Sequence, residues 1–464
     1  MIKTEISNHL KRLLSPEQVV HYGVVIVNGD EDNLEIVHKC ETKDLQKEEL
    51  ELILNRNLAF EKIDVENFDR LISSNYRMAS SPGSSRINLT DDVFENIVNH
   101  ANNAGASDIH IEPSDKQTRI RFRIDGALKQ FYQFPASEHA LLVNKIKIKA
   151  NLNISEKRRN QDGRITQKIG VTIIDIRVST LPSLYGEKIV LRLLETEQED
   201  VDIDKIGLSE EQKKIYQKAY SKTNGIILIS GPTGSGKTTT LYATLKELNK
   251  ESLNILTVED PIEYTLNGIN QVQIKHDIGF DFASALKTFL RQDPDIIMVG
   301  EIRDTETAQM AVKAALTGHL VLSTIHTNSA LGTLDRLIDM GVPKYLIAST
   351  LNLSVAQRLV RLLCNDCKKS ELSKLDFFNG DDELETNHYK SNGCSSCNFT
   401  GYKGRTALFE MIEIGSKISE NIKLGNSIIK DEQFSNYRSI KKQAIDLLKS
   451  GNTSYEEIFP LLIE

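Results

Sequence analysis

The chain has 464 residues, of which 39% are apolar and 26% are charged, and its formal net charge is -8. At about 150 residues per domain this length predicts about three domains, and the apolar fraction is sufficient to give them cores. The acidic balance disfavours a nucleic-acid-binding protein, whose binding domain is usually basic. No apolar run approaches the roughly 18 residues that suggest a membrane span, and the N-terminus lacks the apolar core of a signal peptide, so we expect a cytosolic protein.

Residues 1–77 predict a small α/β module. A short amphipathic stretch near the start has apolar residues at Ile2, Ile6, Leu10, Leu13 and Leu14, and residues 22–27 alternate as a strand does. The apolar stripe is most simply part of a core, and the alternative is a docking helix for a partner. Residues 78–90 are expected to be a linker, because they include a segment rich in serine, proline and glycine.

Residues 91–195 predict a second domain, a sheet with one or two packed helices. A helix is expected over 91–104, and its apolar face would consist of Val93, Ile97, Val98 and Ala101. The segment Arg119–Asp125 alternates strictly, so its apolar residues face the core and its arginines face outward. Further strands are expected at 164–169, 172–180 and 187–194. The acidic residues 196–205 then form a second linker.

Residues 206–464 predict the third domain, in which apolar strands alternate with helical segments. The expected strands are 226–229, 255–258, 296–299 and 320–323. This alternation indicates a parallel sheet with both faces covered by helices. The tail after about residue 408 is expected to be helical.

Gly231-Pro-Thr-Gly-Ser-Gly-Lys-Thr238 matches the P-loop pattern and directly follows an apolar strand. The glycines let backbone N–H groups turn inward around a β-phosphate, Lys237 reaches the β/γ oxygens, and the Thr238 hydroxyl is placed to bind Mg²⁺. The helix that follows adds the positive end of its dipole. The expected nucleotide-binding residues are Gly231, Pro232, Thr233, Gly234, Ser235, Gly236, Lys237, Thr238 and Thr239.

Two acidic residues end neighbouring apolar strands. Glu301 is expected to serve at Mg²⁺, because Gly300 stands where an aspartate would be usual, and Glu259 would then polarise the attacking water. Which of the two is the main base stays open, and capping of a helix or pairing with an arginine is the alternative for each. His326 follows the strand 320–325, where a γ-phosphate sensor could sit; a structural histidine is the alternative.

Four of the five cysteines form two pairs, Cys364-x-x-Cys367 and Cys394-x-x-Cys397. Two such pairs in a cytosolic chain predict a tetrahedral four-thiolate Zn²⁺ site, and a redox pair or unrelated cysteines are the alternative. Because four thiolates leave no open position, the metal would be structural. We expect the zinc element to span 358–407.

In this order the motifs resemble those of the secretion ATPases of type II secretion systems and type IV pilus assembly. The resemblance covers about residues 90–410. Besides the P-loop, it rests on Ser107-Asp-Ile-His-Ile-Glu-Pro113, Gln161-Asp-Gly-Arg164, Arg177-Val-Ser-Thr-Leu-Pro182, Thr257-Val-Glu-Asp-Pro-Ile-Glu-Tyr264, Gly300-Glu-Ile-Arg-Asp304 and Thr317-Gly-His-Leu-Val-Leu-Ser-Thr-Ile-His-Thr327.

The resemblance implies a RecA-like ATPase domain preceded by a PAS-like domain, with ATP, Mg²⁺ and Zn²⁺ bound. It implies catalytic roles for Lys237, Glu259, Glu301 and His326, and it assigns His319 and His326 to a histidine box. It also implies that the second domain swings over the nucleotide and offers Arg177 and Arg192 to the γ-phosphate. On alternation alone these arginines face outward, and a solvated or carboxylate-paired role is the alternative.

Members of this family work as homohexamers that turn an inner-membrane platform protein. The resemblance therefore implies a cytoplasmic protein bound peripherally to the inner membrane through that platform and a docking protein, with no nucleic acid as partner. The N-terminal module is short for the family, so the docking partner stays open. So does the fibre: a secretion pseudopilus, a type IV pilus or a DNA-uptake pilus.

Two other functions are compatible with a P-loop. A nucleic-acid translocase or helicase would use the same core, but the chain is acidic and has no basic stretch interleaved with aromatic residues. A P-loop kinase would transfer phosphate to a small acceptor, which fits poorly with the additional domains and the cysteine pairs.

Overall fold

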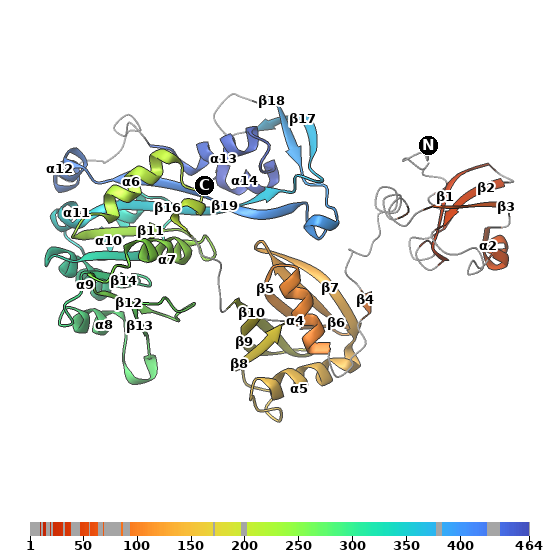
Figure 1. Ribbon diagram of the computed structural model, residues 1–464, viewed down its shortest axis with the longest axis horizontal. Coiled ribbons are helices and arrows are strands. Elements are labelled where there is room, and N and C mark those ends of the chain that lie inside the picture. The colour runs from red at the N-terminus through yellow and green to blue at the C-terminus, as the bar shows by residue number, and fades with distance from the viewer. Residues whose placement is uncertain are drawn as a thin grey trace.

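The structure, a computed structural model, is shown in Figure 1. It describes residues 10, 13–14, 19, 22–30, 33–38, 47–54, 56–63, 68, 85–86, 93–169, 172–195, 202–376, 383–424 and 437–463. The stripe residues Ile2 and Ile6, most of the linker 78–90 and residues 196–201 of the second linker lie outside the described residues.

The first unit combines a three-stranded sheet with a helix. β1 (Val24–Gly29) is antiparallel to β2 (Asn33–His38), and β2 is parallel to β3 (Asn57–Lys62). α2 (Lys47–Leu54) lies between β2 and β3 in the chain, as a parallel pair requires a crossover. Leu10 and Leu14 are buried in the core of this unit, so these two members of the apolar stripe serve packing.

The second unit is a seven-stranded sheet in the order β4-β7-β6-β5-β10-β9-β8, with two helices on one face. The expected helix face and the alternation around Phe122 are confirmed by burial of the predicted residues. Its elements are β4 (Ser85–Arg86), α4 (Val93–Asn103), β5 (Ala106–Pro113), β6 (Gln117–Ile124), β7 (Ala127–Pro135), α5 (His139–Lys149), β8 (Gln161–Ile169), β9 (Thr172–Ser183) and β10 (Gly186–Glu195).

A buried ion pair holds α5 to β10, an interior strand of this sheet. Lys147 is fully buried, and its Nζ lies 2.5 Å from Oε1 of Glu187 on β10. The same ammonium donates to the Glu156 carbonyl at 2.8 Å. Gln161 also donates to that carbonyl, at 3.0 Å, so the connection from α5 into β8 is fixed at both ends. This connection sets the position of β8, which carries Arg164.

The third unit is built on a sheet in the order β13-β12-β14-β15-β11-β16-β19. All strands except β19 run parallel, which confirms the expected parallel sheet. Its elements are α6 (Glu210–Tyr220), β11 (Gly225–Ser230), α7 (Lys237–Leu248), β12 (Ile255–Glu259), β13 (Asn270–Gln273), α8 (Phe282–Phe289), β14 (Ile296–Val299), α9 (Thr305–Leu316), β15 (Leu320–Ile325), α10 (Gly332–Asp339), α11 (Lys344–Thr350), β16 (Leu351–Leu363) and β19 (Tyr402–Glu413).

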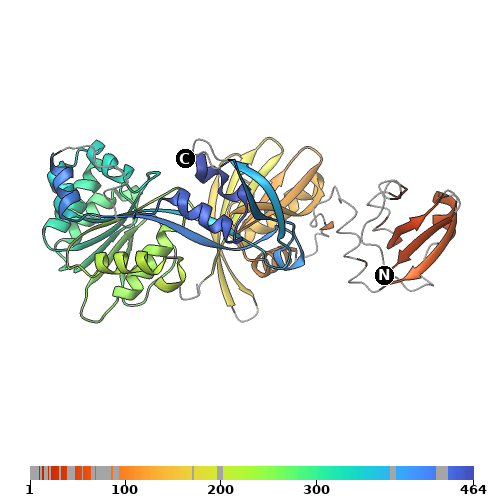
Figure 2. The same ribbon diagram turned by 90° about the horizontal axis from the view of Figure 1, so that it is seen from above.

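Two apolar cores cover the two faces of this sheet. Buried residues of α6 and α7 pack on one face, and those of α8, α9, α10 and α11 pack on the other. Figure 2 shows the two groups of helices on opposite sides of the strands. Every residue of β11, β12, β14 and β15 is buried, so these strands read as continuous apolar runs rather than alternating ones.

The strands β16 and β19 continue beyond the sheet as a two-stranded ribbon that ends at the cysteine pairs (Figures 1 and 2). The sequence did not indicate these strands, and residues 408–413, expected in a helical tail, belong to β19. The helices follow after them. The remaining elements are β17 (Lys369–Asp376), β18 (Glu383–Lys390), α12 (Ser416–Leu424), α13 (Ile440–Lys449), α14 (Tyr455–Ile463) and the 3₁₀ turns Ala136–Glu138, Ile203–Lys205, His276–Ile278 and Ser395–Cys397.

The cysteine-bearing end of the ribbon touches both the second unit and the C-terminal helices. Asp125, at the β6–β7 turn, accepts a hydrogen bond from the Gly404 backbone at 3.1 Å. Lys129 donates to the Asn398 carbonyl, and its ammonium lies 5.6 Å from the centre of the Phe399 ring. Tyr402 is hydrogen-bonded to Ser454 at 2.7 Å, just before α14. The ribbon therefore joins three parts of the chain.

Candidate active site

The P-loop lies at the carboxyl end of β11, where parallel sheets place their ligands. Gly234 and Gly236 have φ of 81° and 85°, the left-handed region that glycine adopts without strain. Gly236 is the N-cap of α7, so the helix begins at Lys237. Pro232, Thr233, Gly234, Thr238 and Thr239 are exposed. The open face of the loop therefore combines backbone N–H groups, three threonine hydroxyls and the positive end of α7.

Lys237 is held against the loop that it follows. Its Nζ donates to the carbonyls of Gly231 at 2.8 Å and Pro232 at 2.9 Å. Burial lowers the pKa of Lys237, and the negative charge of nearby Glu301 acts in the opposite sense. The lysine is thus fixed in direction beside an acidic group, and its contact with the β/γ oxygens stays a prediction.

Glu301 lies directly beyond β14 and meets two basic side chains. Its Oε2 lies 3.3 Å from Nε2 of His326, and its Oε1 pairs with Arg303. The carboxylate is 14% exposed, whereas the imidazole is half exposed. The structure thus brings Lys237, Glu301 and His326 together at one edge of the sheet.

Packing explains why Gly300 stands where an aspartate is usual. A Cβ at this position would lie 3.3 Å from the carbonyl of Val258 and 3.4 Å from Cα of Glu259. The Gly300 N–H also donates to that same carbonyl at 2.8 Å, which keeps the two backbones close. A larger residue at this position would require the backbone of β12 to shift by a few tenths of an ångström, beside the two acids.

Glu259 ends β12 in a different environment, because both of its carboxylate oxygens accept hydrogen bonds from neutral groups. Thr257 donates at 2.6 Å and Gln271 at 3.1 Å to Oε1, and Tyr242 of α7 donates to Oε2. Burial, and then the charge of Glu259, raise the pKa of Tyr242, so the tyrosine keeps the proton that it donates. Glu259 is only 3% exposed. Its carboxylate ties β12 to α7 and β13.

The two histidines of the expected histidine box lie at opposite ends of β15. His326 follows the carboxyl end of the strand, whereas His319 precedes its start, so the whole strand separates them. Nδ1 of His319 lies 2.8 Å from the Ala314 carbonyl and 3.1 Å from the Thr317 hydroxyl at the end of α9. Of the two histidines, His326 contacts Glu301, whereas His319 is hydrogen-bonded at the C-terminal end of α9.

Arg177 reaches from the second unit to the segment that follows β12. Its NH2 donates to the Ile262 carbonyl at 2.8 Å, and its NH1 lies 3.9 Å from Oε2 of Glu263. Its Nε is buried and has no hydrogen-bond partner among the residues that the structure describes. Arg192 instead pairs with Asp108 at 3.1 Å within its own sheet.

The strand register adds a third arginine, Arg164, which lies in a quoted motif but was given no role from the sequence. Arg164 on β8 pairs with Arg177 on β9, and Arg177 pairs with Arg192 on β10. Three cations therefore lie directly opposite one another on adjacent strands, although like charges in such positions destabilise a sheet. Among the described residues no carboxylate is paired with Arg164. Arg164 is the final residue of the motif Gln161-Asp-Gly-Arg164. That it lies beside Arg177 depends on the register of β8 and β9, which the motif does not show.

A hollow of about 520 Å³ opens over these arginines. Its lining consists of Asp162, Gly163, Arg164, Arg177, Val178, Ser179, Val190 and Arg192. Arg192 and Arg177 have carboxylate partners and Asp162 also lines the hollow, but Arg164 has no carboxylate partner among the described residues. Three guanidinium groups around a hollow are suited to an anion such as a phosphate.

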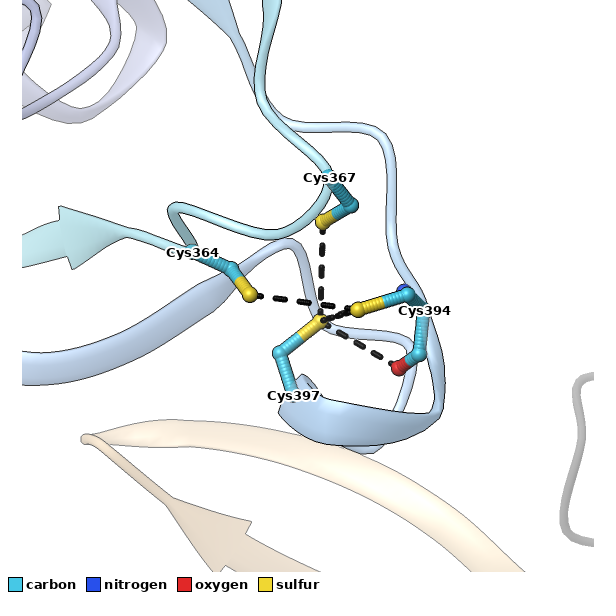
Figure 3. Close-up of side chains that lie close together, drawn as sticks. All are labelled: Cys364, Cys367, Cys394 and Cys397. Carbon is cyan, nitrogen blue, oxygen red and sulfur yellow. Dashed lines mark hydrogen bonds between the residues drawn. The ribbon is translucent and has the colours of Figure 1, made fainter.

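The four paired cysteines converge at the end of the ribbon (Figure 3). The Sγ–Sγ distances of Cys364 to Cys394, Cys367 to Cys397, and Cys394 to Cys397 are each 3.8 Å. A tetrahedron with Zn–S bonds of about 2.3 Å has edges of about 3.8 Å, so the four sulfurs fit zinc. The backbone N–H groups of Cys394 and Gly401 donate to Sγ of Cys397 at 3.2 Å each, as the outer shell of a thiolate site does.

The parallel sheet, the P-loop and the acids at neighbouring strand ends define a RecA-like P-loop ATPase. The solved structures with the same fold support this class. The Legionella pneumophila ATPase DotB matches with a TM-score of 0.61 and 22% identity, over 83% of this chain and 98% of that one. The pilus retraction motor PilT with bound ADP matches with a TM-score of 0.53 and 25% identity, over 78% of this chain and 95% of that one.

Within this class the chain belongs to the type II/IV secretion system protein family, whose model matches residues 86–460. It is 45% identical to the type II secretion system ATPase E of Vibrio cholerae, over 76% of this chain and 71% of the relative. It is also 45% identical to the type IV pilus assembly ATPase PilB of Myxococcus xanthus, over 76% of this chain and 64% of the relative. The resemblance seen in the motifs is confirmed, and the chain is an ATPase of this family.

None of the described helices is both long and apolar enough to span a membrane.

The cysteine geometry generates the first prediction. We expect one zinc per chain, and binding in small structural sites is worth about 10 to 16 kcal/mol apparent. Removal of the metal should loosen residues 364–402, and also 450–457, because Lys368, Tyr402 and Arg361 bind Gly451, Ser454 and Glu457. Metal analysis under reducing conditions and hydrogen exchange before and after chelation test this. The control is the exchange of β11 and α7, which should not change. Protein without zinc, or an unchanged pattern after chelation, would contradict the assignment.

Proposed function

We propose that this chain is the ATP-hydrolysing motor that powers assembly of a type II secretion pseudopilus or a type IV pilus. The observation that carries the proposal is the family match over residues 86–460, together with relatives of both kinds at 45% identity. The four-cysteine cluster is compatible with a member of the family that assembles a fibre. A role in DNA uptake would use the same motor and a related fibre.

We further propose that the motor is a homohexamer bound peripherally, on the cytoplasmic side, to an inner-membrane platform protein. A docking protein would hold the N-terminal module. ATP is the substrate, and Thr238 is the residue placed to hold Mg²⁺, which would supply positive charge at the phosphates. The energy of hydrolysis would reach the platform through movement of the second domain relative to the ATPase domain.

A genetic experiment tests this function. Deletion of the gene should abolish secretion of a type II substrate or surface piliation, and a plasmid copy should restore it. A Lys237→Ala copy should not restore it, because the lysine stabilises charge on the transferring phosphoryl group. The matched control is Lys246→Ala, which lies in the last turn of the same helix. If the deletion leaves secretion, piliation and transformation intact, the proposed function is wrong.

The geometry favours Glu301 as the carboxylate that acts at the nucleotide. The Glu301 carboxylate contacts His326 and lies close to the charge of Lys237. The Glu259 carboxylate, in contrast, already accepts hydrogen bonds from three neutral donors. We propose that Glu301 orients and polarises the attacking water, that His326 contacts the γ-phosphate, and that Glu259 holds β12 against α7.

Paired isosteric variants test this division. Glu301→Gln should lower kcat by about 10²- to 10⁴-fold, the usual contribution of a positioned base. Glu259→Gln should lower it less than about tenfold, because an amide retains most of the bonds to Thr257, Gln271 and Tyr242. Steady-state phosphate release, with ATP binding checked in parallel, measures both. If Glu259→Gln is the more severe change, the two roles must be exchanged.

We also propose that the arginine cluster, defined as Arg164, Arg177 and Arg192, completes the site when the second domain closes over the nucleotide. Arg177 already contacts the segment after β12, and its Nε has no partner in the present arrangement. A γ-phosphate would offset the repulsion among three adjacent guanidinium groups.

Single alanine variants test the arginine cluster. Arg177→Ala should lower kcat by about 10³-fold or more, as for an arginine that contacts the transferring phosphoryl group. Arg164→Ala should also lower kcat, although no role was given to this residue from the sequence. The matched control is Arg119→Ala, since Arg119 lies on the same face but pairs with Glu112 outside the hollow. Equal effects of Arg119→Ala and Arg164→Ala on phosphate release would refute the role of the cluster.

A further inference from the structure

Gln357 on β16 binds the P-loop from the side opposite to its open face. The side chain is 2% exposed. Its Nε2 donates to the Ser235 carbonyl at 2.9 Å, and its Oε1 accepts a hydrogen bond from the Thr240 hydroxyl at 2.9 Å. A single side chain thus holds both the loop and the first turn of α7.

Gly231 and Gly236, at the two ends of the loop, also lie close to Gln357. A Cβ at Gly231 would lie 2.5 Å from the Gln357 carbonyl oxygen, and one at Gly236 would lie 2.9 Å from Gln357 Nε2. Both glycines have positive φ, at 148° and 85°. The loop can lie this close to β16 only where these residues lack side chains.

The bond to Ser235 fixes the direction of one peptide group. In a trans peptide the C=O and the following N–H point in opposite directions. Because the Ser235 carbonyl is held toward β16, the Gly236 N–H must point away from β16, toward the exposed side of the loop. That is the direction in which a P-loop N–H meets a phosphate.

We propose that Gln357 is a positioning residue that holds the P-loop in its phosphate-binding shape before ATP arrives. The role requires a group that donates and accepts at once, and an amide does both. If the bond to Ser235 is lost, the loop can turn its peptides, and the apparent affinity falls by the fraction of molecules that remain competent. The residue acts through Ser235 and Gly236 and does not contact the reacting atoms.

The test compares two buried glutamines in the full-length chain. Gln357→Glu removes the donor but retains the acceptor and the shape. The control is Gln212→Glu, because Gln212 also donates from a buried amide, to the Phe409 carbonyl at 2.6 Å, but lies on α6 away from the loop. Glutamate at 212 can still accept from the backbone at the start of α6, so that helix keeps its cap.

Gln357→Glu should raise the Kd for a fluorescent ATP analogue, and the KM for ATP, by about 10- to 100-fold, and should lower kcat less than threefold. Gln212→Glu should lower the thermal stability about as much as Gln357→Glu does, but it should leave Kd and KM unchanged. Unchanged nucleotide affinity in Gln357→Glu, or equal losses of affinity in both variants, would overturn the proposal.

A second pair of variants covers the case in which Gln357→Glu does not fold. Thr240→Val removes the hydroxyl that holds Oε1, and Thr240→Ser keeps it. The valine variant should bind the ATP analogue several-fold more weakly, and serine should restore the wild-type Kd. Equal affinities of the two variants would contradict a positioning role for Gln357.

Discussion

The parallel direction of β11, β12, β14 and β15 is the constraint on which the site depends. Parallel strands place all their carboxyl ends at one edge, so four segments far apart in the sequence meet there. They supply the P-loop, Glu259, Glu301 and His326. The same constraint separates His319 from His326, since a residue before a strand lies at the opposite edge from a residue after it. Motif membership alone would treat these histidines as equivalent.

The nucleotide site also depends on β16. This strand pairs with β11 beside the P-loop, carries Gln357 there, and continues as one element to Leu363, next to Cys364. Its partner β19 returns from the cysteines to the sheet. A stiff ribbon thus connects the nucleotide site with the cysteine cluster, and the cluster touches the second domain through Asn398 and Gly404. The zinc element would then serve to fix the end of the ribbon, which four thiolates can do without an enclosing apolar core.

The second domain shows how a chain of net negative charge builds a cationic surface. Its outward face carries arginines on β6, β8, β9 and β10, and two buried acids balance only part of them. Glu112 binds Arg119, Arg121 and Lys188, and although burial opposes its ionisation, these cations hold its pKa at about 2. Asp108 serves Arg123 and Arg192. Among the described residues no carboxylate pairs with Arg164, which faces the hollow together with Arg177 and Arg192.

The sequence by itself determined the elements whose signal is local. Continuous apolar runs predicted the buried parallel strands, alternation predicted the second sheet, the glycine pattern predicted the P-loop, and the cysteine spacing predicted that the four sulfurs meet. These signals are local because periodicity and phosphate or thiolate chemistry act over a few neighbouring residues. Only the tertiary structure decided which side chains meet. It enclosed Glu259 in neutral donors, joined Glu301 to His326, set Arg164 beside Arg177, and placed Gln357 behind the P-loop. Register, strand order and burial are set by packing between segments distant in the chain, and no local pattern encodes them.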